Sequence, residues 1–200
     1  MSKGFLLVVS GPSGCGKGTI SKELLRRNEK LIFSVSATTR KPRVGEKDGI
    51  NYFFIDEERF QSMVSGGEFL EYAYVHNNYY GTPRKVVLDN IEKGEIVLLE
   101  IDVQGALQVK KAYPEAVFIF ILPPSMDELK NRITKRGTET QKDIDIRLKN
   151  AFEELKFVDE YDYFVINDKV KNAVENIEAI ITAEELKVKR HKNLLENINI

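Results

Sequence analysis

The sequence predicts an α/β fold in which a mostly parallel sheet is flanked by helices. Short apolar runs alternate with segments of helical periodicity along most of the chain. The run Phe5–Ser10 is almost wholly apolar, as expected for a strand that is buried on both faces. A glycine-rich turn joins this run to the first helical segment, an arrangement typical of phosphate-binding α/β folds. At 200 residues, the chain has room for one main domain and an inserted lobe.

The same patterns place the individual elements. We expect the strands of the main sheet at residues 5–10, 32–35, 96–101, 117–122 and 163–166. We expect helices at residues 19–27, 103–112, 126–135, 143–158 and from 170 to about 191. The stretch 37–90 is rich in Tyr and Gly and breaks the alternation, which indicates an inserted lobe of short antiparallel strands around one helix. The polar segment 137–142, flanked by arginines, suggests a mobile lid.

The composition excludes several classes of protein. The chain has 30 Lys and Arg against 31 Asp and Glu, a net charge of −1, which argues against a protein that coats nucleic acid or an anionic membrane. A single Cys rules out a disulfide within the chain. The longest apolar runs are too short to span a bilayer, and the N-terminal run lacks a signal-peptide cleavage site. We therefore expect a cytoplasmic protein.

The strongest motif directly follows the first strand and has the spacing G-x-x-x-x-G-K. Glycines let a loop turn several backbone N–H groups toward a phosphate, and the next helix adds the positive end of its dipole. The lysine supplies a flexible charge for the β- and γ-phosphates. The alternative is an ordinary glycine-rich turn. The candidate residues of this phosphate-binding loop are Gly11, Pro12, Ser13, Gly14, Cys15, Gly16, Lys17, Gly18 and Thr19.

The loop departs from the usual motif at the residue after the lysine. Gly18 stands where a Ser or Thr hydroxyl normally binds Mg²⁺, and Thr19 comes next. Either Thr19 or a water molecule would fill that coordination position, and the sequence leaves the choice open.

Two further motifs lie in the inserted stretch. Arg40 and Arg43 surround a proline turn after a strand rich in hydroxyl side chains, and two such guanidinium forks suit a second phosphate group. The alternative is a solvated basic turn. Residues 68–72 and 78–83 combine acidic and tyrosine side chains, and the tyrosines offer flat faces and hydroxyls to a base or a phosphate. The alternative for these aromatics is packing in a core or hairpin.

Acidic and basic residues complete the candidate site. Glu100 and Asp102 lie at the end of an apolar strand, a position at which phosphate-loop enzymes hold Mg²⁺. The alternative for Asp102 is an N-cap of the next helix. Arg132, Arg136 and Arg147 bracket the predicted lid and could neutralise charge on a transferring phosphoryl group. Each could equally be an ordinary residue of a helix surface.

Together these motifs resemble those of the guanylate kinase family in its small bacterial form. The matching stretches run in family order from about residue 5 to residue 168, and their joint occurrence is highly specific. The resemblance implies a CORE domain of residues 1–36, 91–125 and 148–200, a GMP-binding lobe of residues 37–90 and a LID of residues 126–147. The matching stretches are GPSGCGKGT, SVSATTRKPRVGEKDGINYFF, EFLEYA, NNYYGTP, LLEIDVQGA, LPPS and RGTET.

The resemblance also implies the reaction ATP + GMP ⇌ ADP + GDP with Mg²⁺ as cofactor. The expected partners are therefore ATP and GMP, with the use of dGMP left open. Ser36, Glu71 and Thr82 match the positions at which the family recognises guanine. The residues that match the family's GMP-phosphate contacts are Arg40, Arg43, Tyr52 and Tyr80.

On the ATP side, the resemblance places Glu100 and Asp102 between the two nucleotides, in reach of GMP. Asp102 and Thr19 would lie nearest Mg²⁺, directly or through water. Asn167 and Asp168 match an Asn-Asp pair close to adenine. The arginines expected to close around the ATP phosphates are Arg132, Arg136 and Arg147, of which Arg147 would also reach GMP.

The chemistry of this reaction agrees with the residues present. The phosphate of GMP is mostly ionised at neutral pH because its second pKa is about 6, so its attack needs no general base. No His lies in the motifs, and catalysis is then positioning and charge stabilisation. The residues expected to form the transition-state clamp are Lys17, Arg40, Arg43, Arg136 and Arg147.

Glu71 explains a preference for guanine. Its carboxylate can accept both the N1–H and the 2-amino group, whereas adenine has neither donor, a difference of roughly 10–100-fold. One alternative is a kinase for AMP or another nucleoside monophosphate. Another is a phosphopeptide-binding scaffold module of similar fold, against which the intact Gly11, Gly16 and Lys17 argue. A GTPase switch would need an Asn-Lys-x-Asp stretch, which is absent. We expect a monomer or a small homo-oligomer.

Overall fold

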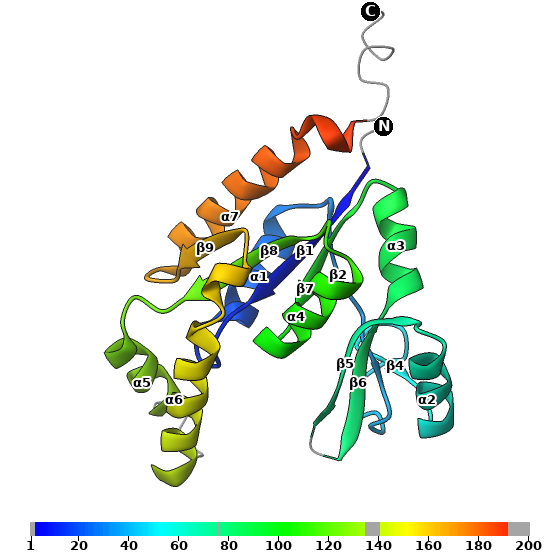
Figure 1. Ribbon diagram of the computed structural model, residues 1–200, viewed down its shortest axis with the longest axis horizontal. Helices are drawn as coiled ribbons and strands as arrows, with labels where there is room; N and C mark the ends of the chain where they lie inside the picture. The colour runs from blue at the N-terminus through cyan, green and yellow to red at the C-terminus, as the bar shows by residue number, and fades with distance from the viewer. Residues whose placement is uncertain (1–2, 76, 135–140, 192–200) are drawn as a thin grey trace, which may run out of the picture.

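The computed structural model describes residues 3–75, 77–134 and 141–191, the first three of the last range as backbone only. Its centre is a parallel sheet of five strands in the order β2-β7-β1-β8-β9 (Figure 1). The α/β fold predicted from the sequence is confirmed. The strands are β1 (Phe5–Ser10), β2 (Leu31–Phe33), β7 (Ile96–Glu100), β8 (Val117–Leu122) and β9 (Tyr163–Ile166).

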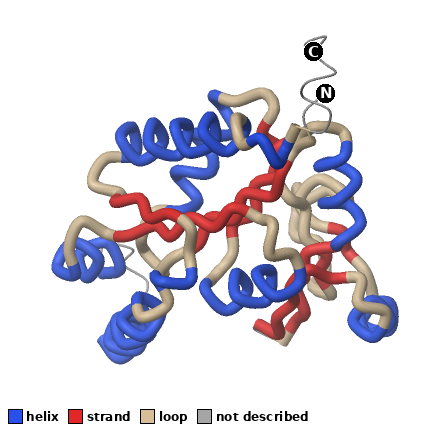
Figure 2. The backbone as a smooth tube through the Cα atoms, turned by 45° about the horizontal axis from the view of Figure 1, so that its top comes forward, coloured by secondary structure: helices blue, strands red, loops and turns tan. Residues whose placement is uncertain are grey.

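Helices cover both faces of this sheet (Figure 2). Phe5, Leu7 and Val9 of β1 pack on one face, and Leu6 and Val8 pack on the other. Both sets of side chains are buried, which explains why β1 is a nearly continuous apolar run in the sequence. On the first face lie α1 (Lys17–Arg27), α5 (Met126–Thr134), α6 (Gln141–Leu155) and α7 (Val170–Glu185), and on the second lie α3 (Arg84–Glu92) and α4 (Val103–Ala112).

The inserted stretch forms a smaller sheet in the order β4-β3-β6-β5 (Figure 1). Its β3–β6 and β6–β5 pairs are antiparallel, as expected, but β3 and β4 are parallel, so the sheet is mixed. Helix α2 (Glu57–Ser65) packs on it through Phe60, whose ring stacks on Phe69 at 4.5 Å between centroids. The strands are β3 (Ala37–Thr38), β4 (Phe53–Phe54), β5 (Phe69–Val75) and β6 (Asn78–Pro83).

Helices α3 and α4 connect the small sheet to the main domain. Gln108 on α4 exchanges two hydrogen bonds of 3.1 Å with the backbone N–H and C=O of Tyr72 on β5. Helix α3 follows β6 directly and buries Val87 and Ile91 against the parallel sheet. The inserted strands are therefore held on the main domain from two sides.

The last helix is shorter than its sequence pattern predicts. Helix α7 ends at Glu185 because Lys187 adopts an extended conformation. The chain then turns back, so that Arg190 binds Glu184 at 2.7 Å and covers the ring of Phe5. In the part of the chain that is described, no helix is both long and apolar enough to cross a membrane. Two short 3-10 turns complete the fold, η1 (Val158–Glu160) and η2 (Val188–Arg190).

Candidate active site

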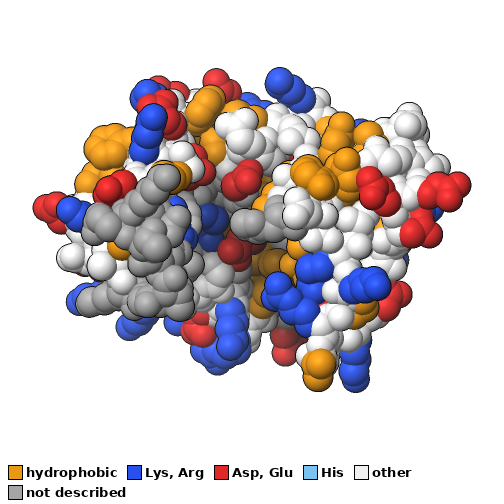
Figure 3. All heavy atoms as spheres, turned by 90° about the horizontal axis from the view of Figure 1, so that it is seen from below, with side chains coloured by type: hydrophobic (Ala, Val, Ile, Leu, Met, Phe, Trp, Pro, Cys, Tyr) orange, Lys and Arg blue, Asp and Glu red, His pale blue; other side chains and the backbone are white. Residues whose placement is uncertain are grey.

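Predicted site residues gather at the carboxyl ends of the parallel strands, the edge at which open α/β sheets bind ligands. The loop 11–16 follows β1, Asp102 follows β7 and Asn167 follows β9. The strand register aligns Val9 of β1 with Glu100 of β7, so the loop and the acidic residues begin at the same level. Seen from below, the molecule is hollowed near its middle, and acidic and basic side chains gather around the hollow (Figure 3).

Close contacts at two glycines shape the predicted phosphate-binding loop. At Gly11, with φ +139°, a Cβ would lie 2.4 Å from the carbonyl oxygen of Ile121. At Gly16, with φ +88°, a Cβ would lie 2.5 Å from Asn167 Nδ2. Helix α1 begins at the next residue, Lys17, so its positive end faces the loop. The glycine spacing of the motif is thus a steric requirement of this loop.

Lys17 bridges the two ends of the loop. Its Nζ donates to the carbonyl oxygens of Gly11 and, at 3.2 Å, of Pro12. Burial lowers the pKa of this ammonium, and nearby acidic groups such as Glu100 and Glu154 oppose that effect. The side chain is therefore held inside the loop, where a phosphate could replace the carbonyls as its partner.

Two residues predicted to contact ATP support the loop from behind. The buried Asn167 donates from Nδ2 to the carbonyl oxygen of Cys15 at 2.7 Å. Arg132 on α5 donates to the carbonyl oxygen of Asn167 at 3.0 Å and to Glu128 Oε1 at 2.9 Å. Asp168 is exposed, and its carboxylate accepts from the next backbone N–H. The structure thus connects Asn167 and Arg132 to the loop, a link that their spacing in sequence does not indicate.

Helix α6, which begins in the segment predicted as a lid, contacts the tip of the loop. Arg147 on α6 donates from Nη2 to Ser13 Oγ at 2.6 Å. Ala151, one turn later, is buried in the same apolar cluster as Cys15. Burial raises the pKa of the Cys15 thiol to about 11, so this group is uncharged at neutral pH and packs as a small apolar side chain. Arg136 lies outside the described residues.

Three residues predicted near Mg²⁺ or between the two nucleotides lie in different surroundings. Glu100 lies against the loop, since a Cβ at Gly18 would be 3.5 Å from Glu100 Oε1. Asp102 is the N-cap of α4, its Oδ1 accepting from Gly105 N–H at 2.8 Å, and it remains exposed. Thr19 is exposed and lines a groove between α1 and α7. Within the described ranges, no group of three or more His, Cys, Asp or Glu could hold a metal ion.

Glu71 and Thr82 form a buried polar pair on β5 and β6. The hydroxyl of Thr82 donates to Glu71 Oε1 at 2.6 Å, and the two residues are only 0% and 8% exposed, respectively. Burial raises the pKa of the Glu71 carboxyl, and the Thr82 hydrogen bond opposes that effect. Its Oε2 faces Gly105, at which a Cβ would be 3.4 Å away. Ser36 is half-buried just before β3, in the same sheet.

Arg40 contacts an acidic side chain and an aromatic ring. Its Nη2 donates to both carboxylate oxygens of Glu46, at 2.8 and 3.0 Å, and its guanidinium carbon is 5.4 Å from the centroid of the Tyr52 ring. Tyr80 meets Tyr52 edge-on at 5.9 Å. The hydrogen-bonded ion pair raises the pKa of Arg40 and lowers that of Glu46. Arg43 is exposed, and its backbone N–H donates to Glu46 at 2.7 Å.

Asp102 lies between the loop and the lobe. Burial lowers the pKa of Lys17 and the charge of Asp102 opposes that shift, whereas burial raises the pKa of Glu71 and the charge of Asp102 adds to that shift. The structure therefore brings two groups of predicted residues to one edge of the sheet, one on the loop and one on the small sheet. Sequence reasoning missed Glu46, for which the only signal is an acidic residue within a basic turn.

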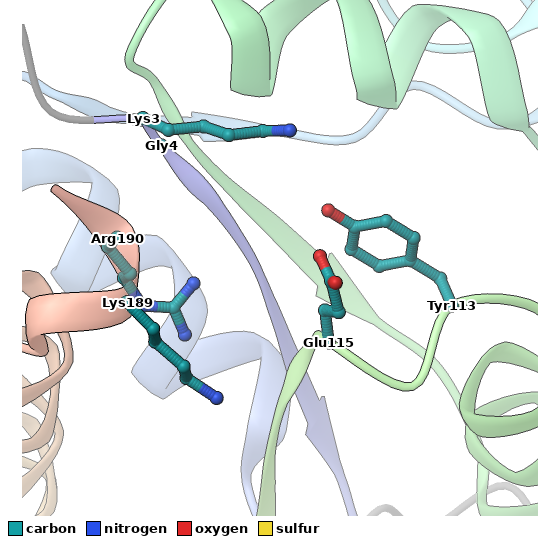
Figure 4. A pocket seen from close by; sticks show the side chains of 6 residues that line it. All are labelled: Lys3, Gly4, Tyr113, Glu115, Lys189 and Arg190. Carbon is teal, nitrogen blue, oxygen red and sulfur yellow. The ribbon is translucent and has the colours of Figure 1, made fainter. Parts of the chain in front are cut away.

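A separate cavity of about 150 Å³ lies at the opposite, amino end of the sheet (Figure 4). Two of its cations are already paired, Lys3 with Glu92 at 2.6 Å and Arg190 with Glu184 at 2.7 Å. None of the predicted site residues lines it, so it is not part of the candidate site. Its lining residues are Lys3, Gly4, Tyr113, Glu115, Lys189 and Arg190.

The parallel sheet, the loop after its first strand and the inserted mixed sheet define a phosphate-loop α/β protein of the kinase type. The guanylate kinase family model matches residues 3–184. The chain is 57% identical to the guanylate kinase of Clostridioides difficile over 195 residues, which cover 98% of this chain and 95% of that protein. It is 58% identical to the guanylate kinase of Caldanaerobacter subterraneus subsp. tengcongensis over 192 residues, 96% and 93% of the two chains.

A solved structure agrees with these relatives. The crystal structure of guanylate kinase from Anaplasma phagocytophilum matches with a TM-score of 0.75 and 39% sequence identity, and the match covers 98% of this chain and 94% of that one. The chain therefore belongs to the guanylate kinase family, whose members are ATP:GMP phosphotransferases. The family, fold class and enzyme class that the sequence predicts are confirmed.

Proposed function

We propose that this chain transfers the γ-phosphoryl group of ATP to GMP, with the ATP phosphates on the loop 11–19 and GMP on the small sheet. The observation that carries the proposal is the burial of the Glu71 carboxylate without a cationic partner among the described residues. This carboxylate accepts a hydrogen bond from the hydroxyl of Thr82. Removing a carboxylate from water without a cation costs free energy, so such a group favours a ligand that brings its own donors.

Guanine supplies those donors. Its N1–H and 2-amino group lie side by side and suit the two oxygens of the Glu71 carboxylate. The hydrogen of the Thr82 hydroxyl already goes to Glu71 Oε1, which holds the carboxylate in place. Ser36 is therefore the better candidate donor to the O6 atom of guanine. Adenine lacks both donors and would leave the carboxylate buried and unpaired.

The GMP phosphate is assigned to the basic end of the lobe. Arg40 and Arg43 supply the charge there, and the rings of Tyr52 and Tyr80 stand beside the Arg40 guanidinium. A guanidinium fork can donate two parallel hydrogen bonds to a phosphate, and tyrosine hydroxyls can add further donors. The phosphate would thus be bound at a fixed distance from the base pocket.

The ATP phosphates are assigned to the loop. Their oxygens would accept from the backbone N–H groups and from Lys17, which would exchange its carbonyl partners for the phosphate. Arg147 reaches the same region, since it contacts Ser13 at the loop tip. We assign Asn167 and Arg132 to positioning of the loop, and we keep Arg136 as a candidate for charge stabilisation and Asp168 as a candidate neighbour of adenine.

Mg²⁺ fits the residues present. Thr19, Glu100 and Asp102 offer the hard oxygen ligands that Mg²⁺ prefers, and few protein ligands are needed because Mg²⁺ keeps several waters and binds phosphate oxygens. When bound, the ion would neutralise charge on the phosphates. Asp102 uses one oxygen to cap α4 and keeps the other exposed.

The reaction then needs no general base. The GMP phosphate attacks as an ionised oxygen, and Lys17 and the arginines stabilise the charge that builds up on the transferring group. The protein's part is to align the two phosphates and to exclude water, which would otherwise hydrolyse ATP.

The proposal is tested by ADP release with Mg·ATP and, in turn, GMP, dGMP, AMP, CMP and UMP. We expect turnover with GMP to exceed turnover with AMP by at least about tenfold, from the contact with Glu71 alone. Turnover with AMP instead would leave the phosphate clamp intact and contradict the guanine pocket. Folded protein without turnover on any of the five would favour a binding module.

A further inference from the structure

Glu46 is an acidic residue within the basic turn that follows β3. Its carboxylate receives two hydrogen bonds from Arg40 Nη2, at 2.8 and 3.0 Å, and a third from the backbone N–H of Arg43 at 2.7 Å. The side chains of Arg40 and Glu46 are only 14% and 19% exposed. One carboxylate therefore contacts both arginines that are assigned to the GMP phosphate.

Other contacts complete the orientation of Arg40. Its Nη1 donates to the carbonyl oxygen of Lys41 at 2.8 Å, and its guanidinium carbon lies 5.4 and 5.8 Å from the ring centroids of Tyr52 and Phe54. The plane and the direction of the fork are thus defined by groups on three parts of the lobe. A long side chain that is oriented in advance loses less entropy when it binds a ligand.

We propose that Glu46 is a positioning residue for GMP: it orients Arg40 and holds the 40–46 turn so that both arginines face the phosphate. This inference rests on the proposed function, since it takes the phosphate of GMP as the ligand of Arg40 and Arg43. The effect expected from lost orientation has the opposite sign to the effect expected from charge alone. Removing a negative charge near a phosphate site should strengthen phosphate binding, whereas loss of orientation should weaken it.

The lobe offers a matched control in a second Arg–Glu pair. Arg59 Nη2 and Glu68 Oε2 are 3.4 Å apart, with side chains 54% and 45% exposed, and neither belongs to the proposed site. Exposed pairs of this kind contribute little to stability. Glu68→Gln therefore makes the same chemical change in the same lobe without touching the turn.

The experiment measures calorimetric binding of GMP and of guanosine to the full-length protein and to Glu46→Gln, Glu46→Ala and Glu68→Gln. Guanosine lacks the phosphate and reports the base pocket alone. We expect Glu46→Gln to raise the Kd for GMP on the order of tenfold, because the charge-assisted hydrogen bonds that orient Arg40 are weakened. The Kd for guanosine should stay within about twofold of the unchanged protein, because guanosine has no phosphate for Arg40 to bind. Glu46→Ala should give a larger loss for GMP, and Glu68→Gln should change neither Kd.

Each other outcome has a distinct meaning. Equal or tighter GMP binding by Glu46→Gln overturns the proposal and makes Glu46 a bystander or a competitor of the phosphate. Equal weakening of GMP and guanosine overturns it as well, because Glu46 would then maintain the lobe as a whole. Failure of the unchanged protein to bind GMP in preference to AMP is a failure of the proposed function and is seen before any variant is compared.

Discussion

At the scale of single residues, Glu71 connects folding with recognition. Its carboxylate is buried beside Thr82, and burial raises its pKa from the ordinary value of a glutamate. The protein therefore keeps a group that opposes folding at neutral pH and that only a ligand's donors can fully satisfy. The same residue should control which base is accepted and how stable the free protein is.

The first prediction concerns base recognition. Glu71→Gln should raise the KM for GMP by about 10–100-fold, because the amide can accept only one of the two guanine hydrogen bonds and carries no charge. The KM for ATP should stay nearly unchanged, since Glu71 lies on the small sheet and not on the loop. Steady-state kinetics with each substrate varied in turn measures both. Equal loss for ATP and GMP would contradict the assignment.

The second prediction concerns stability. A carboxyl whose pKa is raised on folding opposes the folded state once the pH exceeds that pKa and not below its unfolded pKa. Glu71→Gln should therefore increase the free energy of unfolding at pH 7.5, by about 1 kcal/mol. The gain should shrink as the pH falls toward the usual range of a glutamate. Urea denaturation at several pH values tests this, and a constant or negative difference would argue against a buried ionised Glu71.

At the scale of elements, the phosphate-binding loop is held by segments that are remote in sequence. Strand β8 approaches Gly11, the end of β9 supplies Asn167 to Cys15, and α6 brings Arg147 to Ser13. Residues 11–17 alone would not maintain this shape, because a loop of several glycines has high conformational entropy when unfolded. Contacts from β8, from the end of β9 and from α6 therefore maintain the shape of the loop.

The third prediction tests this support. Asn167→Ala removes the donor to the buried carbonyl of Cys15 and should lower the free energy of unfolding by about 1–3 kcal/mol. The KM for ATP should rise while the KM for GMP changes little, because only the loop loses its support. Thermal denaturation and kinetics measure the two effects. Asn172→Ala, in which an exposed contact with Asp168 is lost, is a suitable control with little expected change.

At the scale of the whole molecule, charged residues of the loop and of the inserted sheet approach each other near the end of β7. The loop carries Lys17, the inserted stretch carries Glu71, and Asp102, the N-cap of α4, acts electrostatically on both. Two bound nucleotides would bring many negative charges together in this region. Productive alignment then requires the lobe and the lid helices to move toward the loop.

The fourth prediction is that the molecule becomes more compact when both nucleotides bind. Small-angle scattering should show a smaller radius of gyration with GMP and a non-hydrolysable ATP analogue together than without nucleotide. Each nucleotide alone should give a smaller decrease, because each is assigned to a different side of the site. An unchanged radius with both nucleotides would contradict closure as the means of excluding water.

The sequence alone determined the fold class and the family, and it places a glycine-rich loop directly after the first strand. Each is indicated by a local sequence pattern: β1 is a continuous apolar run because both its faces are covered, and the positive φ at positions 11 and 16 favours glycine. The N-cap role of Asp102 was likewise among the alternatives that the sequence offered. The division into domains and the roles of individual site residues remain predictions, with Arg136 outside the described residues.

Only the tertiary structure shows which side chains contact each other within the site. Nothing in the sequence indicates that Glu46 binds Arg40, that Asn167 supports Cys15 across 152 positions, or that burial raises the pKa of Glu71. Each of these facts depends on which segments pack together, and hence on distances and local dielectric rather than on spacing along the chain. Local pattern identifies the groups that carry the chemistry, and three-dimensional packing determines their partners and their charge because both arise from long-range contacts.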